Sequence, residues 1–193
     1  MGLEDIAMFR SVPNCVVLYP SDAVSTFHAV TLAANHKGMV FIRTNRSATA
    51  VFYKNSEKFK IGESKVAISN KSDKLTIVGA GVTFDEAMKA AEILKKKKIY
   101  VRVVDMFCVK PVDKKTLIQS AKATKNTILT VEDHYCEGGI FEAVCSAVAS
   151  EGVKVFSLAV KEIPRSGKPT ELLAKYKIDA DSIVSKVKKI IGK

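Results

Sequence analysis

Two arginines that follow an apolar run are well placed to bind an anionic ligand. Arg43 and Arg46 come directly after Met39 to Ile42, a run that predicts a parallel strand. Ligands of open α/β sheets bind at the carboxyl ends of the strands, where a guanidinium group can hold a phosphate through two hydrogen bonds. Position alone does not distinguish a phosphate site at these two arginines from an ordinary solvated surface position.

A second group of polar residues follows another predicted strand. Glu132-Asp133-His134 comes after the run Thr127 to Val131, in a predicted strand-end loop that is a suitable place for acid–base chemistry. Gly138-Gly139 then precedes a helix, where backbone N–H groups can hold an anion. Because no nucleophile is apparent nearby, we interpret this segment as a structural turn.

A glycine turn is similar to part of a dinucleotide-binding loop. Gly79-Ala80-Gly81 follows the apolar run Leu75 to Val78, and Asp105 lies where an acid that binds ribose is expected. Phe84 stands at the third glycine position, however, and its ring obstructs the close approach of helix and strand that such a loop requires. We interpret the turn as an ordinary strand-to-helix connection, with a dinucleotide-binding domain as the alternative.

The histidines and cysteines lack the spacing of metal ligands. The three histidines share no helix face, and the four cysteines form no C-x-x-C pair. These residues are His28, His36, His134, Cys15, Cys108, Cys136 and Cys145. We therefore predict buried, reduced thiols and no metal site.

The stretch from Lys74 to Pro111 predicts a strand, a helix and a second strand. Thr83 and Glu86 have the spacing of a capping box at the start of the helix. Small apolar residues recur at helical spacing, which lets the helix lie close to a sheet. A strand–helix–strand unit of this length implies a right-handed crossover between parallel strands, so the predicted fold class is α/β.

The predicted elements divide the chain into unequal parts. Residues 1–53 contain only two strands, too few for a parallel sheet covered on both faces, so we expect a partial α/β domain that docks on the rest or belongs to a larger domain. Residues 54–64 form a predicted linker. Residues 65–193 predict a domain with a mostly parallel sheet, helices on both faces and one antiparallel edge strand. That edge strand, 65–68, is expected to fold back on 75–78.

Composition narrows the class of protein. Hydrophobic residues make up 47% of the 193 residues, as in globular proteins, and no apolar run is long enough to span a membrane. The chain does not start like a signal peptide, so we expect a cytoplasmic protein without a membrane partner. A formal charge of +11 favours anionic partners such as sugar phosphates. The lysines lack the interleaved aromatic residues of nucleic-acid-binding modules, so nucleic acid is not an expected partner.

Five blocks of sequence, in collinear order, cover essentially the whole chain. They read LEDIAMFRSVPNCVVLYPSDAV, GMVFIRTNR, KLTIVGAGVTFDEAMKAAEIL, ILTVEDHYCEGGIFEAV and IPRSGKPTELL. Together they closely resemble the C-terminal part of transketolase, in particular its animal-type forms. The resemblance implies that residues 1–53 are the last portion of a pyrimidine-binding domain, and that residues 65–193 are a complete C-terminal domain.

The resemblance also implies an activity and its cofactors. Transketolases are homodimeric transferases that move a two-carbon ketol unit between sugar phosphates, with thiamine diphosphate and Mg (or Ca). Their catalytic glutamate and their cofactor and metal ligands belong to segments absent here. We therefore expect no cofactor on this chain alone and no activity, with a stand-alone interaction or dimerisation module as a further alternative.

One residue matches a substrate contact of the family. Arg46 corresponds to the arginine after the R-T-[SN] run, which binds the sugar phosphate. Ser47 stands where the animal enzymes often have proline, which bears on the geometry of this loop. The C-terminal domain carries no transferable catalytic residue.

Overall fold

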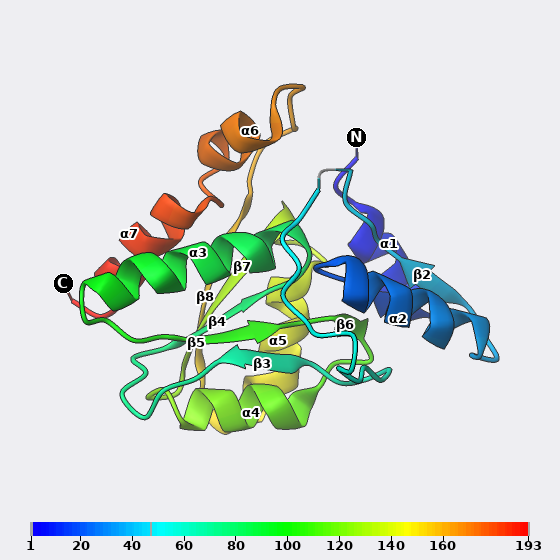
Figure 1. Ribbon diagram of the computed structural model, residues 1–193, viewed down its shortest axis with the longest axis horizontal. Coiled ribbons are helices and arrows are strands. Elements are labelled where there is room, and N and C mark those ends of the chain that lie inside the picture. The colour runs from blue at the N-terminus through cyan, green and yellow to red at the C-terminus, as the bar shows by residue number, and fades with distance from the viewer. Residues whose placement is uncertain (1, 47, 193) are drawn as a thin grey trace.

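The computed structural model describes residues 2–46 and 48–192, which form two β-sheets flanked by helices (Figure 1). The larger sheet has five strands in the order β3-β5-β4-β7-β8. They are β3 (Lys65–Ile68), β4 (Thr76–Gly79), β5 (Arg102–Asp105), β7 (Thr127–Tyr135) and β8 (Lys154–Val160). β4, β5, β7 and β8 run parallel, and β3 pairs antiparallel with β5. The predicted mixed sheet with one antiparallel edge strand is confirmed.

Helices cover both faces of the larger sheet. α3 (Val82–Lys96) and α7 (Ala180–Ile190) lie on one face, and α4 (Lys114–Lys122) and α5 (Ile140–Val148) on the other (Figure 1). Side chains alternate along the strands, so Ile77 packs with the first pair of helices and Val78 with the second. The short helices are η1 (Ala149–Glu151) and α6 (Pro169–Lys175). This sheet therefore has an apolar core on each face.

The smaller sheet takes strands from both parts of the chain. Its order is β2-β1-β6, in which β1 (Val16–Leu18) is parallel to β2 (Val40–Ile42) and antiparallel to β6 (Cys108–Lys110). α1 (Asp5–Ser11) packs on one face, and α2 (Ala23–Ala34) on the other. The sequence predicts β1 and β2 but not β6. The first part of the chain thus docks on the second by pairing with one of its strands.

The stretch that joins the two parts is packed against the fold. Residues 48–64 form no helix or strand. The backbone N–H groups of Phe52 and Tyr53 nevertheless donate to the Asp22 carboxylate at 2.8 and 3.0 Å. Phe59 is 5% exposed and packs its ring against Tyr53 and Phe107. Buried aromatic side chains therefore hold this connection against the fold.

Two local predictions are wrong. The turn at residues 69–73 does not form a hairpin with β4, because the edge strand β3 pairs with β5 instead. Thr83 and Glu86 do not form a capping box, because α3 begins two residues earlier than predicted, with Gly81 as its N-cap. The Thr83 hydroxyl donates to the Val131 carbonyl at 2.8 Å, and Glu86 accepts the N–H of Ala180 at the start of α7. Both side chains bond to other elements of the fold, and Glu86 also accepts from Lys89 Nζ within α3 at 2.7 Å.

Candidate functional site

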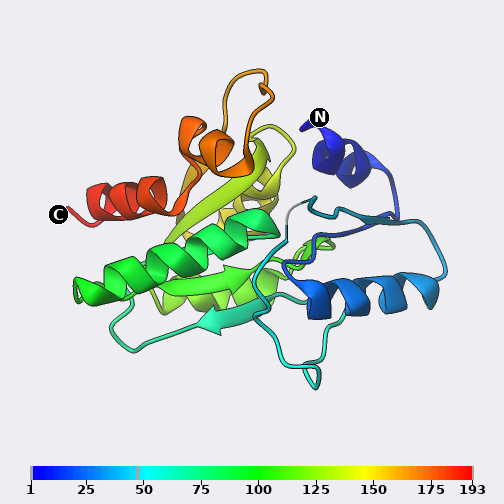
Figure 2. The same cartoon turned by 45° about the horizontal axis from the view of Figure 1, so that its top comes forward.

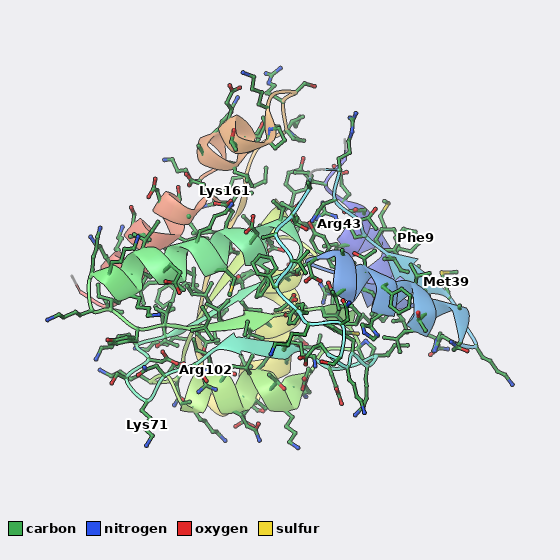
Figure 3. All side chains as sticks on the ribbon, viewed as in Figure 1. Phe9, Met39, Arg43, Lys71, Arg102 and Lys161 are labelled. Carbon is green, nitrogen blue, oxygen red and sulfur yellow. The ribbon has the colours of Figure 1, made fainter. Side chains whose placement is uncertain are left out.

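The carboxyl ends of strands from both sheets meet at the junction of the two parts (Figure 2). Arg43, directly after β2, lies at this junction (Figure 3). Its Nε donates to Asp5 at 2.9 Å, and its Nη1 donates to the Asp133 carboxylate at 2.7 Å. Nη2 donates to the backbone carbonyl of Asp133 at 3.1 Å. Arg43 is thus fully engaged within the protein and is not available for a ligand.

The surroundings of Arg43 favour its charged form. Its guanidinium carbon lies 4.7 Å from the centroid of the Tyr19 ring, a cation–π contact. Burial lowers the pKa of Arg43, but Asp133, Tyr19 and Asp5 together outweigh burial and raise it. The hydroxyl of Tyr19 lies 2.8 Å from Asn45 Oδ1 and 3.0 Å from Asp133 Oδ2, which ties the residues after β2 to the end of β7.

Arg46 lies three residues further on and is exposed. Of the two arginines proposed from the sequence, only Arg46 therefore presents its guanidinium group to solvent at this edge. Asn45, next to it in the chain, is fixed by Tyr19. Ser47, whose replacement of proline bears on this loop, lies outside the described residues. The assignment of Arg46 as a phosphate contact stays a prediction. Arg46 is exposed, and the preceding residue, Asn45, is held by its hydrogen bond with Tyr19.

Asp105 occupies a buried junction and does not face a ribose. Its carboxylate accepts from the hydroxyls of Ser21 and Tyr53, both at 2.8 Å, and the Ser21 Oγ in turn accepts the N–H of Gly81 at 2.9 Å. Burial raises the pKa of Asp105 to about 7. The Tyr19 ring lies directly against Gly81, so a side chain at that position has no space. These contacts fill the turn that the sequence compares with a dinucleotide-binding loop.

Sequence reasoning did not single out Ser21, Tyr53 or Tyr19 for this junction. Each is a hydroxyl-bearing residue in or beside a predicted strand or linker, and its partner lies at least 52 positions away along the chain. The only sequence signal is their position at strand ends, which many polar residues share.

Glu132 and His134 are structural. They belong to β7, which continues to Tyr135, so the predicted loop is wrong. The Glu132 carboxylate accepts the N–H groups of Ile140 and Phe141 at the start of α5, and burial raises its pKa to about 8. His134 is buried and accepts the N–H of Ala7 through Nε2 at 3.3 Å. The protein's own carboxylate thus occupies the helix terminus that Gly138-Gly139 precedes.

The hollows found on the described surface lie away from Arg46. Within residues 2–46 and 48–192, no cluster of His, Cys, Asp or Glu side chains is suited to a metal ion. One surface hollow, of about 430 Å³, is lined by Lys74, Lys125 and Ile190, and another, of about 300 Å³, is lined by Tyr135 and Lys161. Neither includes Arg46, and the strand ends at the junction are filled by side chains. No helix in this part of the chain is long and apolar enough to cross a membrane.

Comparisons with known proteins match the two parts of the chain to two families. The family described as "Transketolase, pyrimidine binding domain" matches residues 1–51, and "Transketolase, C-terminal domain" matches residues 64–183. Transketolase of Homo sapiens is 57% identical over 194 residues, covering 100% of this chain and 31% of the human protein. Transketolase-like protein 2 of Mus musculus is 58% identical with the same coverage.

A solved structure shares the arrangement of both parts. It is described as a split gene transketolase, an inactive β4 tetramer. It superposes with a TM-score of 0.91 at 33% identity, covering 100% of this chain and 62% of that chain. The chain spans about a third, 31%, of the length of the mammalian relatives. A partial pyrimidine-binding domain is followed along the chain by the C-terminal domain, and this chain therefore belongs to the transketolase family.

Proposed function

We propose that this chain is the part of a transketolase that supplies a phosphate contact and the C-terminal domain to the transfer of a two-carbon ketol unit between sugar phosphates. The proposed boundaries are 1–53 for the pyrimidine-binding portion, 54–64 for the connection and 65–193 for the C-terminal domain. Family membership supports the activity, and the junction between the two sheets supports a rigid mounting for the contact. The reaction belongs to the pentose phosphate pathway of the cytoplasm.

The observation that carries the proposal is the contrast between Arg43 and Arg46. Two carboxylates, from Asp5 and Asp133, neutralise Arg43, while Arg46 is exposed beyond the same strand. A phosphate is recognised best by a guanidinium group that keeps both of its donor pairs for the ligand. Arg46 therefore binds the sugar phosphate, and Arg43 holds the base of its loop in place.

Thiamine diphosphate and Mg (or Ca) supply the carbanion-stabilising chemistry of the family. We propose that segments outside these 193 residues bind both groups in the full-length enzyme, because the family's cofactor and metal ligands do not map onto this chain. The chain by itself is accordingly inactive towards sugar phosphates. The residues present contribute binding and orientation, and no proton transfer is assigned to them.

We further propose that the chain associates with copies of itself. The similar split-gene protein is described as an inactive β4 tetramer, which supports both self-association and inactivity of such a chain. Transketolases are homodimers, which agrees with this proposal. Sugar phosphates are the small-molecule partners, and neither nucleic acid nor a membrane is a proposed partner.

Reconstitution tests the proposed function. The purified chain is mixed with the remaining N-terminal portion of a mammalian transketolase, thiamine diphosphate and magnesium, and ketol transfer from xylulose 5-phosphate is followed. We expect no turnover by the chain alone and turnover by the mixture. Turnover by the chain alone contradicts the proposal, and so does an inactive mixture in which the two pieces bind each other.

Substitution of Arg46 tests its role in the same mixture. R46A should raise KM for xylulose 5-phosphate at least about tenfold, since a charge-assisted contact contributes roughly 1.5–3 kcal/mol. Turnover of a donor without phosphate should not change. R165A removes an exposed arginine from another region and serves as the matched control. An unchanged KM in R46A would remove Arg46 from the site.

A dinucleotide-binding domain is the remaining alternative from another class. Thermal protection of the chain by NAD or NADP would favour it. The side chains that fill the turn at Gly81 argue against such protection.

A further inference from the structure

The helix α2 has an apolar surface that its own sheet does not use. Its twelve residues include no Asp, Glu, Lys or Arg. Ser25 and Ala29 are buried on the side that faces the sheet. The opposite side bears Ala23, Phe27, Val30 and Ala34, and all four are exposed. Phe27 is 68% and Val30 56% exposed.

These four residues form one continuous stripe along the helix. Their spacing of four, three and four positions places them on one face, because an α-helix has 3.6 residues per turn. A helix at a protein surface normally turns polar side chains to solvent, so an exposed apolar stripe is a candidate contact surface. Both views place α2 at the outer end of the molecule, away from the five-stranded sheet (Figures 1 and 2).

The spacing of the stripe is self-complementary. The point midway between residues 28 and 29 lies equally far from Phe27 and Val30, and equally far from Ala23 and Ala34. A two-fold axis through this point therefore places Phe27 against Val30 of the second copy, and Ala23 against Ala34. Symmetric dimers use the same patch on both subunits in this way. The small alanines at the ends let two antiparallel helices approach closely around the larger central pair.

Electrostatics favours a second copy over a charged partner at this face. The chain carries a formal charge of +11, so two copies repel each other through most of their surfaces. α2 adds no charge of its own, which makes its stripe a low-repulsion surface for contact between copies. An acidic partner would find no lysine or arginine on the helix. We propose that the exposed face of α2 is a self-association surface at which two copies pack antiparallel, an inference that rests on the self-association proposed above.

The size of the surface predicts a weak contact. Stable interfaces bury roughly 1,600 Å² in total, whereas a twelve-residue helix is only about 18 Å long. The helix pair therefore supplies the apolar centre of an interface and not the whole of it. Phe27 is its expected anchor, because aromatic residues at the centre of an interface carry most of the binding energy.

The proposal is tested with the full chain by sedimentation equilibrium over a range of concentrations. Phe27→Lys and Val30→Glu, each alone, should weaken self-association at least about tenfold, because each places a charge in the apolar contact. An equimolar mixture of the two variants should regain association, since residue 27 of one copy then faces residue 30 of the other as an ion pair. Ile163→Glu changes an equally apolar and 82% exposed residue elsewhere, and it should have no effect.

The outcomes separate this surface from the wider proposal. A wild-type chain that stays monomeric at every concentration overturns both the surface and the proposed self-association. Self-association that Phe27→Lys and Val30→Glu leave unchanged overturns the surface alone. A mixture that regains no association overturns the antiparallel register. Circular dichroism and thermal unfolding of each variant confirm that the fold is intact, and the reconstitution assay tests the enzymatic proposal independently.

Discussion

The two parts of this chain are built from the same kinds of elements but are stabilised in different ways. The C-terminal part has a five-stranded sheet with an apolar core on each face. The N-terminal part contributes only β1 and β2 to its sheet and completes it with β6 from the other part. The N-terminal part thus takes the third strand of its sheet from the C-terminal domain, and we expect its order to depend on that contact.

Those contacts are polar as well as apolar, and they are concentrated at strand ends. Arg43 and Tyr19 reach Asp133 at the end of β7, and Ser21 reaches Asp105 at the end of β5. By contrast, the larger sheet is held mainly by alternating apolar side chains between two layers of helices. Changes at the junction should therefore loosen the N-terminal part first, and changes inside the C-terminal domain should leave the junction intact.

Arg43→Met should have the largest effect. It leaves the carboxylates of Asp5 and Asp133 without their partner, and loss of one member of a buried ion pair costs about 3–5 kcal/mol. We expect the N-terminal part to open at lower urea concentration than the C-terminal domain, as followed by limited proteolysis together with circular dichroism. The matched variant Arg46→Met, at the exposed position, should change the free energy of unfolding by less than about 0.5 kcal/mol.

Gly81→Ala should have the next largest effect. Gly81 has a φ of +54°, and a Cβ atom there would collide with the ring of Tyr19. Strain and overpacking together should lower the free energy of unfolding by about 2–4 kcal/mol. Gly152→Ala is the matched control, because Gly152 has a φ of +64° with no atom within 4 Å of the added Cβ. It should cost only about 1–2 kcal/mol in urea unfolding. Equal losses in the two variants would refute the close contact with Tyr19.

These junction residues also show how much the sequence could predict. Periodicity located nearly every helix and strand, and residues 1–53 were predicted to be a partial domain because two strands cannot form a covered sheet. Pairings between distant segments were not predicted. The partners of Glu86, Asp105 and Asp133 lie 52 to 114 positions away in the sequence, and local spacing contains no information about them. Arg43 and Arg46 looked equivalent for the same reason, since only the fold supplies Asp5 and Asp133 to one of them.

Asp105→Asn should change how stability depends on pH. The folded pKa of about 7 lies above the ordinary value of 3.8, so the folded state binds more protons in that range and loses stability as pH rises from about 4 to 7. Between pH 5 and pH 8, wild type should lose about 2 kcal/mol more than the variant, measured by urea unfolding. Parallel profiles for the two proteins would show that Asp105 is not a buried, hydrogen-bonded carboxylate.

Glu86→Ala should have the smallest effect. It removes the acceptor of the Ala180 N–H at the start of α7, which is 2.8 Å away, and loss of such a cap costs about 1 kcal/mol. The loss should appear in thermal unfolding without loosening the N-terminal part. Glu92→Ala, on the same helix with its side chain 61% exposed, is the matched control and should stay within about 0.5 kcal/mol of wild type. Opening of residues 1–46 in the Glu86 variant would contradict the view that changes inside the C-terminal domain leave the junction intact.

Native-state hydrogen exchange tests the dependence of the N-terminal part on β6 most directly. The Tyr19 N–H donates to the Phe107 carbonyl at 2.8 Å across the junction, and the Arg43 N–H donates to Leu18 at 2.9 Å within the smaller sheet. If the two parts are joined as described, both amides exchange with opening free energies within about 1 kcal/mol of those in β4. Rapid exchange of Tyr19 and Arg43 beside a protected β4 would contradict the account, because the N-terminal part would then open independently of the C-terminal domain.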